Sequence, residues 1–161
     1  MDRSRDIPAK VEGLLGVSVL FGLYLTSLQS YLLFHSLAET FSIVIACGIF
    51  VIAWNSRRLL DNNYLLFLGI AFLFVAGMDL LHMLAYKGMG VFQPKASNLP
   101  TQLWIASRYL EGISFLIAPL FLRQKLNHRY VLTAYTVITL LILVSIFYWK
   151  VFPVCFVVRE R

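Results

Sequence analysis

The sequence predicts an all-α, polytopic membrane bundle with about five transmembrane helices. Two observations carry this prediction. First, 60% of the 161 residues are hydrophobic and only 14% are charged, whereas a soluble domain is nearer half apolar and a quarter charged. Second, the apolar residues gather into runs that reach the roughly 20 residues a helix needs to cross a bilayer. The first run continues far beyond the length of a removable signal peptide.

Five runs are long enough to cross the membrane. The first two are almost continuous, because residues 11–54 contain no Lys, Arg or Pro. A single helix over that stretch would be about 66 Å long, roughly twice the hydrocarbon thickness. We therefore expect the chain to turn at TSLQS (26–30). Pro119 lies inside the fourth run and should kink that helix near its cytoplasmic end. The predicted spans are, in order, 11–29, 31–54, 64–86, 103–122 and 130–152.

The basic residues predict an orientation. Clusters in MDRSRDIPAK, NSRRLLDNN and RQKLNHR all fall on one side of the predicted membrane. Lys and Arg are enriched in cytoplasmic loops, so we expect a multi-pass protein with a cytoplasmic N-terminus. Topology then accounts for the net charge of +6, and nucleic acid is not an expected partner. Five spans would leave the C-terminus outside, and VVRER does not look like a natural chain end, so we expect residues 1–161 to be a fragment of a longer protein.

Six ionisable residues lie inside the predicted spans, away from their ends. They form three pairs, and i,i+3 or i,i+4 spacing places each pair on one face of its helix. At a rise of about 1.5 Å per residue, all six fall roughly 6–14 Å below the outer boundary. Chance would rarely give three helices of alternating direction a polar layer at one depth. The pairs are His35 with Glu39, Asp79 with His82, and Arg108 with Glu111.

This polar layer has two interpretations. As structural contacts, intramembrane polar interactions contribute only about 0.6 kcal/mol each, whereas a charge near the bilayer centre costs about 2.5–3.5 kcal/mol. We therefore favour a site that binds a ligand, metal or cofactor, or senses protons. Arg108 always carries its charge, so it should pair with at least one of the three acids. The remaining negative charge could be offset by a protonated carboxyl, a histidinium or a bound cation.

The sequence does not identify a bound group. His35 and His82 are the first candidates for direct ligands, because a neutral imidazole coordinates without adding negative charge. Two histidines with carboxylates could hold a transition metal, and two histidines on facing helices could be axial ligands of a haem. Neither arrangement has a diagnostic spacing here. No phosphate loop or nucleophile elbow occurs in the sequence, so we expect no catalysis from this chain.

Three stretches resemble the third class of bacterial membrane-associated sensor domains. They are FHSLAETFSIV (34–44), DLLHMLAYKGMGVF (79–92) and NLPTQLWIASRYLE (98–111). The resemblance implies an N-terminal sensory module of the bacterial inner membrane. Such modules precede a cytoplasmic output domain in cis, chiefly a histidine kinase of a two-component system or a diguanylate cyclase that makes cyclic-di-GMP. All six polar residues lie in these stretches, but the resemblance assigns no ligand. Pro100 departs from the pattern, where a smaller helix-compatible residue is expected.

Two other classes of protein account for some of these features. A haem- or quinone-binding electron-transfer subunit is the alternative that the two outer histidines suggest. A piece of a transporter or channel is disfavoured, because the chain has no internal repeat and no Gly/Pro-broken helices at matched positions. The expected partners are the lipid bilayer, an unidentified small ligand or ion and the output domain. The sequence leaves open whether a second copy joins in a homodimer.

Overall fold

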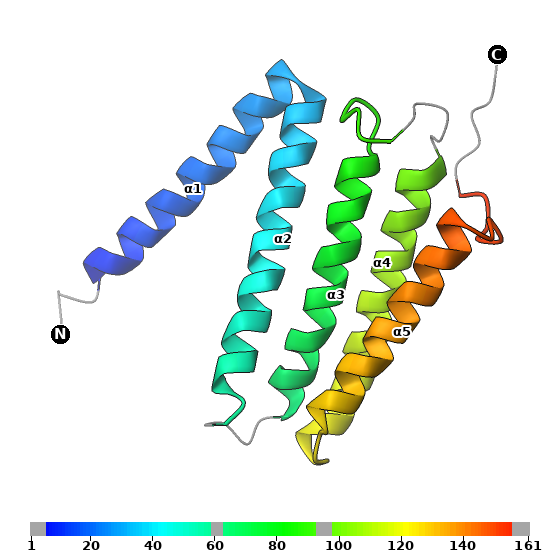
Figure 1. The fold of residues 1–161 in the computed structure, drawn as a ribbon. Coiled ribbons are helices and arrows are strands. Elements are labelled where there is room, and N and C mark those ends of the chain that lie inside the picture. Colours follow the sequence, from blue (N-terminus) through cyan, green and yellow to red (C-terminus); the bar gives the residue numbers. More distant parts are fainter. Residues whose placement is uncertain (1–5, 59–62, 93–97, 156–161) are drawn as a thin grey trace. The chain divides into compact units, whose positions relative to one another are not determined.

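The computed structural model describes residues 6–58, 63–92 and 98–155, and these residues contain helices and no strand (Figure 1). The N-terminal residues 1–5, the LLDN stretch at 59–62, residues 93–97 and the final residues 156–161 lie outside this description. Five of the helices are long and apolar enough to cross a membrane. The predicted all-α class and the five spans are thereby confirmed, and the chain is a multi-pass membrane protein. The helices are α1 (Asp6–Gln29), α2 (Tyr31–Ser56), α3 (Asn63–Ala85), α4 (Asn98–Ile117), the 3₁₀ helix η1 (Ala118–Leu122) and α5 (His128–Phe147).

The chain divides into two compact units, residues 1–40 and 41–161, and α2 contributes to both. In the first unit, Ser30 alone separates α1 from the start of α2. The chain reverses there, as Figure 1 shows and as the length argument predicted. The Ser30 N–H donates to the Thr26 carbonyl, and the Phe34 N–H donates to the Ser30 carbonyl, both at 3.0 Å. The turn therefore leaves these backbone groups paired, although a single residue separates the two helices.

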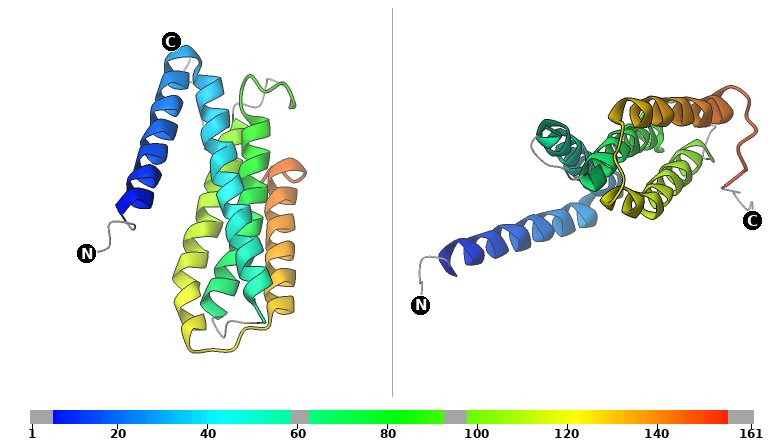
Figure 2. Two further views of the ribbon diagram at one scale, coloured as in Figure 1. Left: turned by 90° about the vertical axis from the view of Figure 1, so that its left-hand side faces the viewer. Right: turned by 90° about the horizontal axis from the view of Figure 1, so that it is seen from below.

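Helix α3 is the central element of the second unit. Its side chains are buried along most of its length, with α4 and α5 beside it in both views of Figure 2. Two apolar clusters lie along it, one near each end. The first cluster includes Leu66, Phe67, Ile70, Ala71 and Tyr135. The second includes Met78, Leu103, Ala106 and Ile146.

Helices α2 and α3 approach closely where two small residues meet. A Cβ built on Gly69 of α3 would lie 2.5 Å from the Cβ of Ala53 on α2. Small residues at such crossings let the backbones of membrane helices come together. Gly69 therefore sets how closely the second half of α2 packs on α3.

The fourth and fifth helices have ends that differ from the predicted spans. Helix α4 begins at Asn98 rather than at 103, because Pro100 falls in its first turn, where a backbone N–H is not needed. Helix α5 ends at Phe147 rather than at 152, and Lys150 has a φ of 53°, which no continuing α-helix allows. At Pro119, where a kink was expected, α4 stops at Ile117 and the chain continues as the 3₁₀ helix η1.

Candidate polar site in the membrane

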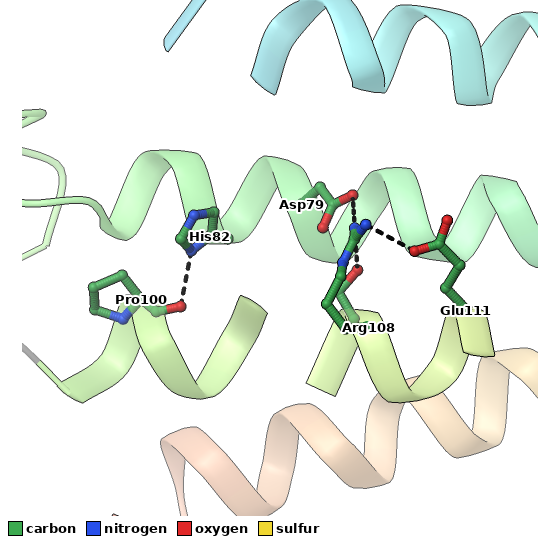
Figure 3. Close-up of polar contacts among 6 residues, drawn as sticks. Asp79, His82, Pro100, Arg108 and Glu111 are labelled. Atoms are coloured by element: carbon green, nitrogen blue, oxygen red, sulfur yellow. Dashed lines mark hydrogen bonds and ion pairs between the residues drawn. The ribbon is translucent and has the colours of Figure 1, made fainter. Parts of the chain in front are cut away.

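Arg108 pairs with acids on two helices (Figure 3). Its Nη2 lies 2.5 Å from Oδ2 of Asp79 on α3, and its Nη1 lies 2.7 Å from Oε2 of Glu111, one turn further along α4. Nη2 also donates to the Oγ of Ser107, at 3.3 Å. The predicted pairing of Arg108 with an intramembrane acid is confirmed, and the ion pair with Asp79 ties α3 to α4.

The charges of this cluster do not balance within the second unit. Two carboxylates share one guanidinium, so the ionised triad of Asp79, Arg108 and Glu111 carries one excess negative charge. Asp79 is only 5% exposed. Its Oδ1 and the Nε of Arg108 are buried without a hydrogen-bond partner among the described residues. The cluster thus retains one acceptor and one donor that a further polar group could satisfy.

His82 is oriented by the backbone of α4. Its Nδ1 lies 2.8 Å from the carbonyl oxygen of Pro100 (Figure 3). A carbonyl only accepts, so Nδ1 carries the proton and donates. In the neutral ring, Nε2 then bears the lone pair. This is the arrangement of metal-ligating histidines, which usually donate their other ring N–H to a carbonyl or carboxylate.

Four of the six predicted site residues lie along the contact between α3 and α4. These are Asp79, His82, Arg108 and Glu111. His35 and Glu39 lie one turn apart near the start of α2 and are half-buried. The His35 ring stacks on that of Tyr31, with centroids 6.1 Å apart and planes inclined by 10°. Because His35 and Glu39 belong to the first unit, their association with the other four stays a prediction from their depth in the sequence.

Comparison with protein families identifies the chain. The family model of the membrane-associated sensor domain MASE3 matches residues 26–160. The chain belongs to the MASE3 family. No curated protein and no solved structure matches it significantly. The resemblance inferred from the three sequence stretches is confirmed, and membership makes this multi-pass membrane protein a sensor domain.

The MASE3 domain also has polar contacts that the sequence analysis missed, at the start of α4. Nε2 of the buried Gln102 donates to the carbonyls of Phe152 and Pro153, at 3.1 and 2.8 Å. Oδ1 of Asn98 accepts from the backbone N–H of Cys155, at 2.7 Å. These side chains fasten the segment after α5 to the first turns of α4. The amides at 98 and 102 were a signal for it, but their partners are backbone groups, which no side-chain pattern reveals.

Proposed function

We propose that this MASE3 domain is the input module of a bacterial receptor in the cytoplasmic membrane. It passes a stimulus sensed at the polar site to a cytoplasmic histidine kinase or diguanylate cyclase in the same chain, and performs no chemistry itself. The supporting observation is the ion-pair cluster between two helices of membrane-spanning length. The Arg108 side chain is 39% exposed there. A charged group facing hydrocarbon is costly, so we expect a further polar group to cover it.

The cluster lies between α3 and α4, so a change in its contacts could change how the two helices pack. The ion pair between Asp79 and Arg108 and the hydrogen bond from His82 to Pro100 both join α3 to α4. A proton, an ion or a small polar ligand that interacts with these groups alters contacts between the two helices. Such an agent shifts the domain only if it binds one helix arrangement better than another. Bonds that cross a helix interface are where that preference can arise.

A metal or haem is the bound group that the histidines support. His35 and His82 are our first candidates for its ligands, with Glu39 beside His35. Support comes from their shared predicted depth of roughly 6–14 Å and from the tautomer of His82, in which Nδ1 donates to the Pro100 carbonyl and the lone pair is on Nε2. A Soret band in the absorbance spectrum of the purified domain would indicate haem, and elemental analysis would identify a metal.

The orientation with a cytoplasmic N-terminus is tested by labelling in intact cells. In a background with Cys47→Ala and Cys155→Ser, one variant carries Asn62→Cys, between α2 and α3, and another carries Lys87→Cys, directly after α3. An impermeant maleimide is expected to label position 87 and to spare position 62 until the cells are permeabilised, because the basic clusters should stay inside. Labelling of position 62 alone in intact cells would reverse the topology.

Replacing His82 is expected to silence a full-length receptor. His82→Ala should abolish the stimulated kinase or cyclase output in membranes, with insertion preserved, because a typical intramembrane hydrogen bond contributes only about 0.6 kcal/mol. His82→Asn retains a side-chain donor and should be equally silent, which separates signalling from folding. The matched control is His128→Ala, at the start of α5, where the ring packs on Trp54; it should signal normally. Normal output from both His82 variants would exclude the polar site as the input.

A further inference from the structure

A narrow apolar groove lies between the last turns of α2 and the first turns of α3, at the opposite end of α3 from His82. Its free volume is about 150 Å³. All of its lining residues belong to the second unit. Its walls include Ile49, Ile52, Leu65 and Leu66, and its polar lining residues are Ser56 and Arg57.

Arg57 is fixed in place beside this groove. Its guanidinium lies over the Trp54 ring, with Cζ 4.3 Å from the ring centroid. Its Nη1 donates to the Trp54 carbonyl, at 2.5 Å. Stacking on an aromatic ring and donation to a carbonyl together restrict a side chain that is otherwise flexible. The neighbouring Arg58 is exposed and does not line the groove.

We propose that the groove binds one acyl chain of an anionic phospholipid, whose headgroup phosphate pairs with Arg57 and Ser56. The groove opens on helices of membrane-spanning length, so hydrocarbon is the solvent that meets its walls. Its apolar walls match an acyl chain, and the guanidinium beside the Ser56 hydroxyl matches a phosphate in charge and in hydrogen bonding. A fixed guanidinium also loses less conformational freedom on binding than a mobile one. The proposal does not depend on the polar site or on its role in signalling.

Lipid retention during native mass spectrometry tests this proposal. The purified domain is equilibrated with phosphatidylglycerol and phosphatidylcholine of identical acyl chains. The wild type should retain one phosphatidylglycerol in preference to phosphatidylcholine. Arg57→Gln should lower that preference about fivefold, which corresponds to about 1 kcal/mol, because a guanidinium held against the headgroup favours a net anionic lipid over a zwitterionic one. The matched control Arg58→Gln removes the same charge one residue away and should change the preference less than twofold.

A second variant tests the acyl-chain part of the proposal. Ile52 lines the groove and is 69% exposed, so Ile52→Trp can fill the groove without burying a larger side chain in the core. It should lower retention of both lipids. If the Arg57 and Arg58 variants lost the preference for phosphatidylglycerol to the same extent, the preference would come from general attraction between basic residues and an anionic surface, and the proposal would fail. The proposal would also fail if the wild type retained both lipids equally, if Ile52→Trp retained lipid normally, or if a second copy of the chain bound in place of lipid.

Discussion

Replacing Arg108 with alanine is expected to destabilise the domain by about 3 kcal/mol, the lower end of the range for breaking a buried ion pair. Arg108 is the only ion-pair partner of Asp79 among the described residues, and its loss leaves a buried carboxylate without a counter-charge. Glu111 loses its ion-pair partner as well, since its Oε2 lies 2.7 Å from Nη1 of Arg108. Unfolding by denaturant in mixed micelles would measure the loss, and the amount of inserted protein should fall in parallel.

Two further variants show whether charge causes this loss. Adding Asp79→Asn to Arg108→Ala removes the stranded charge and should restore more than half of the lost stability, because residues in one ion pair are not additive. Tyr109→Ala is the matched control on the same turn of α4, where the side chain is 68% exposed, and it should be nearly neutral. If the double variant were as unstable as the sum of its single changes, the ion pair would contribute nothing to folding.

Replacing Gly69 with alanine is expected to cost about 2 kcal/mol, as overpacking of a well-filled contact typically does. The new methyl group would meet the Ala53 Cβ at 2.5 Å, and that neighbour has no flexible end that could move aside. The two helices must then separate. Gly69→Leu should cost more, and both losses can be measured by unfolding in the same micelles.

Gly77→Ala is the matched control for this prediction. Gly77 lies on the same helix, and nothing approaches within 4 Å of a Cβ built there. The change should therefore be neutral, or stabilising by up to about 1 kcal/mol through helix propensity. If both alanine variants behaved alike, the close approach of α2 to α3 would not limit packing.

Much of the architecture was predictable from the sequence, because the bilayer constrains it so strongly. A helix must be apolar for about 20 residues to cross, so composition alone located the five spans. The ends of the helices were harder to predict. Residues 98–102 were not assigned to the fourth span, because Pro100 looks like a helix breaker until its place in the first turn is known. The segment after α5 includes Lys150 with a positive φ. The residue type gives no indication of this conformation, because lysine rarely adopts it.

The candidate site was predictable only where it depends on charge. Asp79 and Arg108 lie deep within apolar stretches, which predicted that they would need partners. The structure shows that they form an ion pair with each other. The hydrogen bond from His82 to Pro100 was not predictable, since its acceptor is a backbone carbonyl that any residue could supply. The close approach of α2 to α3 at Gly69 was not predictable either, because a glycine in a helix does not reveal which neighbour approaches it. For His35 and Glu39, helix spacing and depth remain the basis of the prediction.

The first turns of α4 have a mechanical consequence. Pro100, whose carbonyl accepts from His82, lies between Asn98 and Gln102, whose side chains fasten the segment after α5. Adjacent residues of a helical turn move almost as a rigid body, since the backbone ladder couples them. A displacement of the His82 ring would therefore reach the segment 152–155 through one helical turn, without passing along the length of any helix. The first turn of α4 thus connects the imidazole of α3 to the chain segment that follows α5.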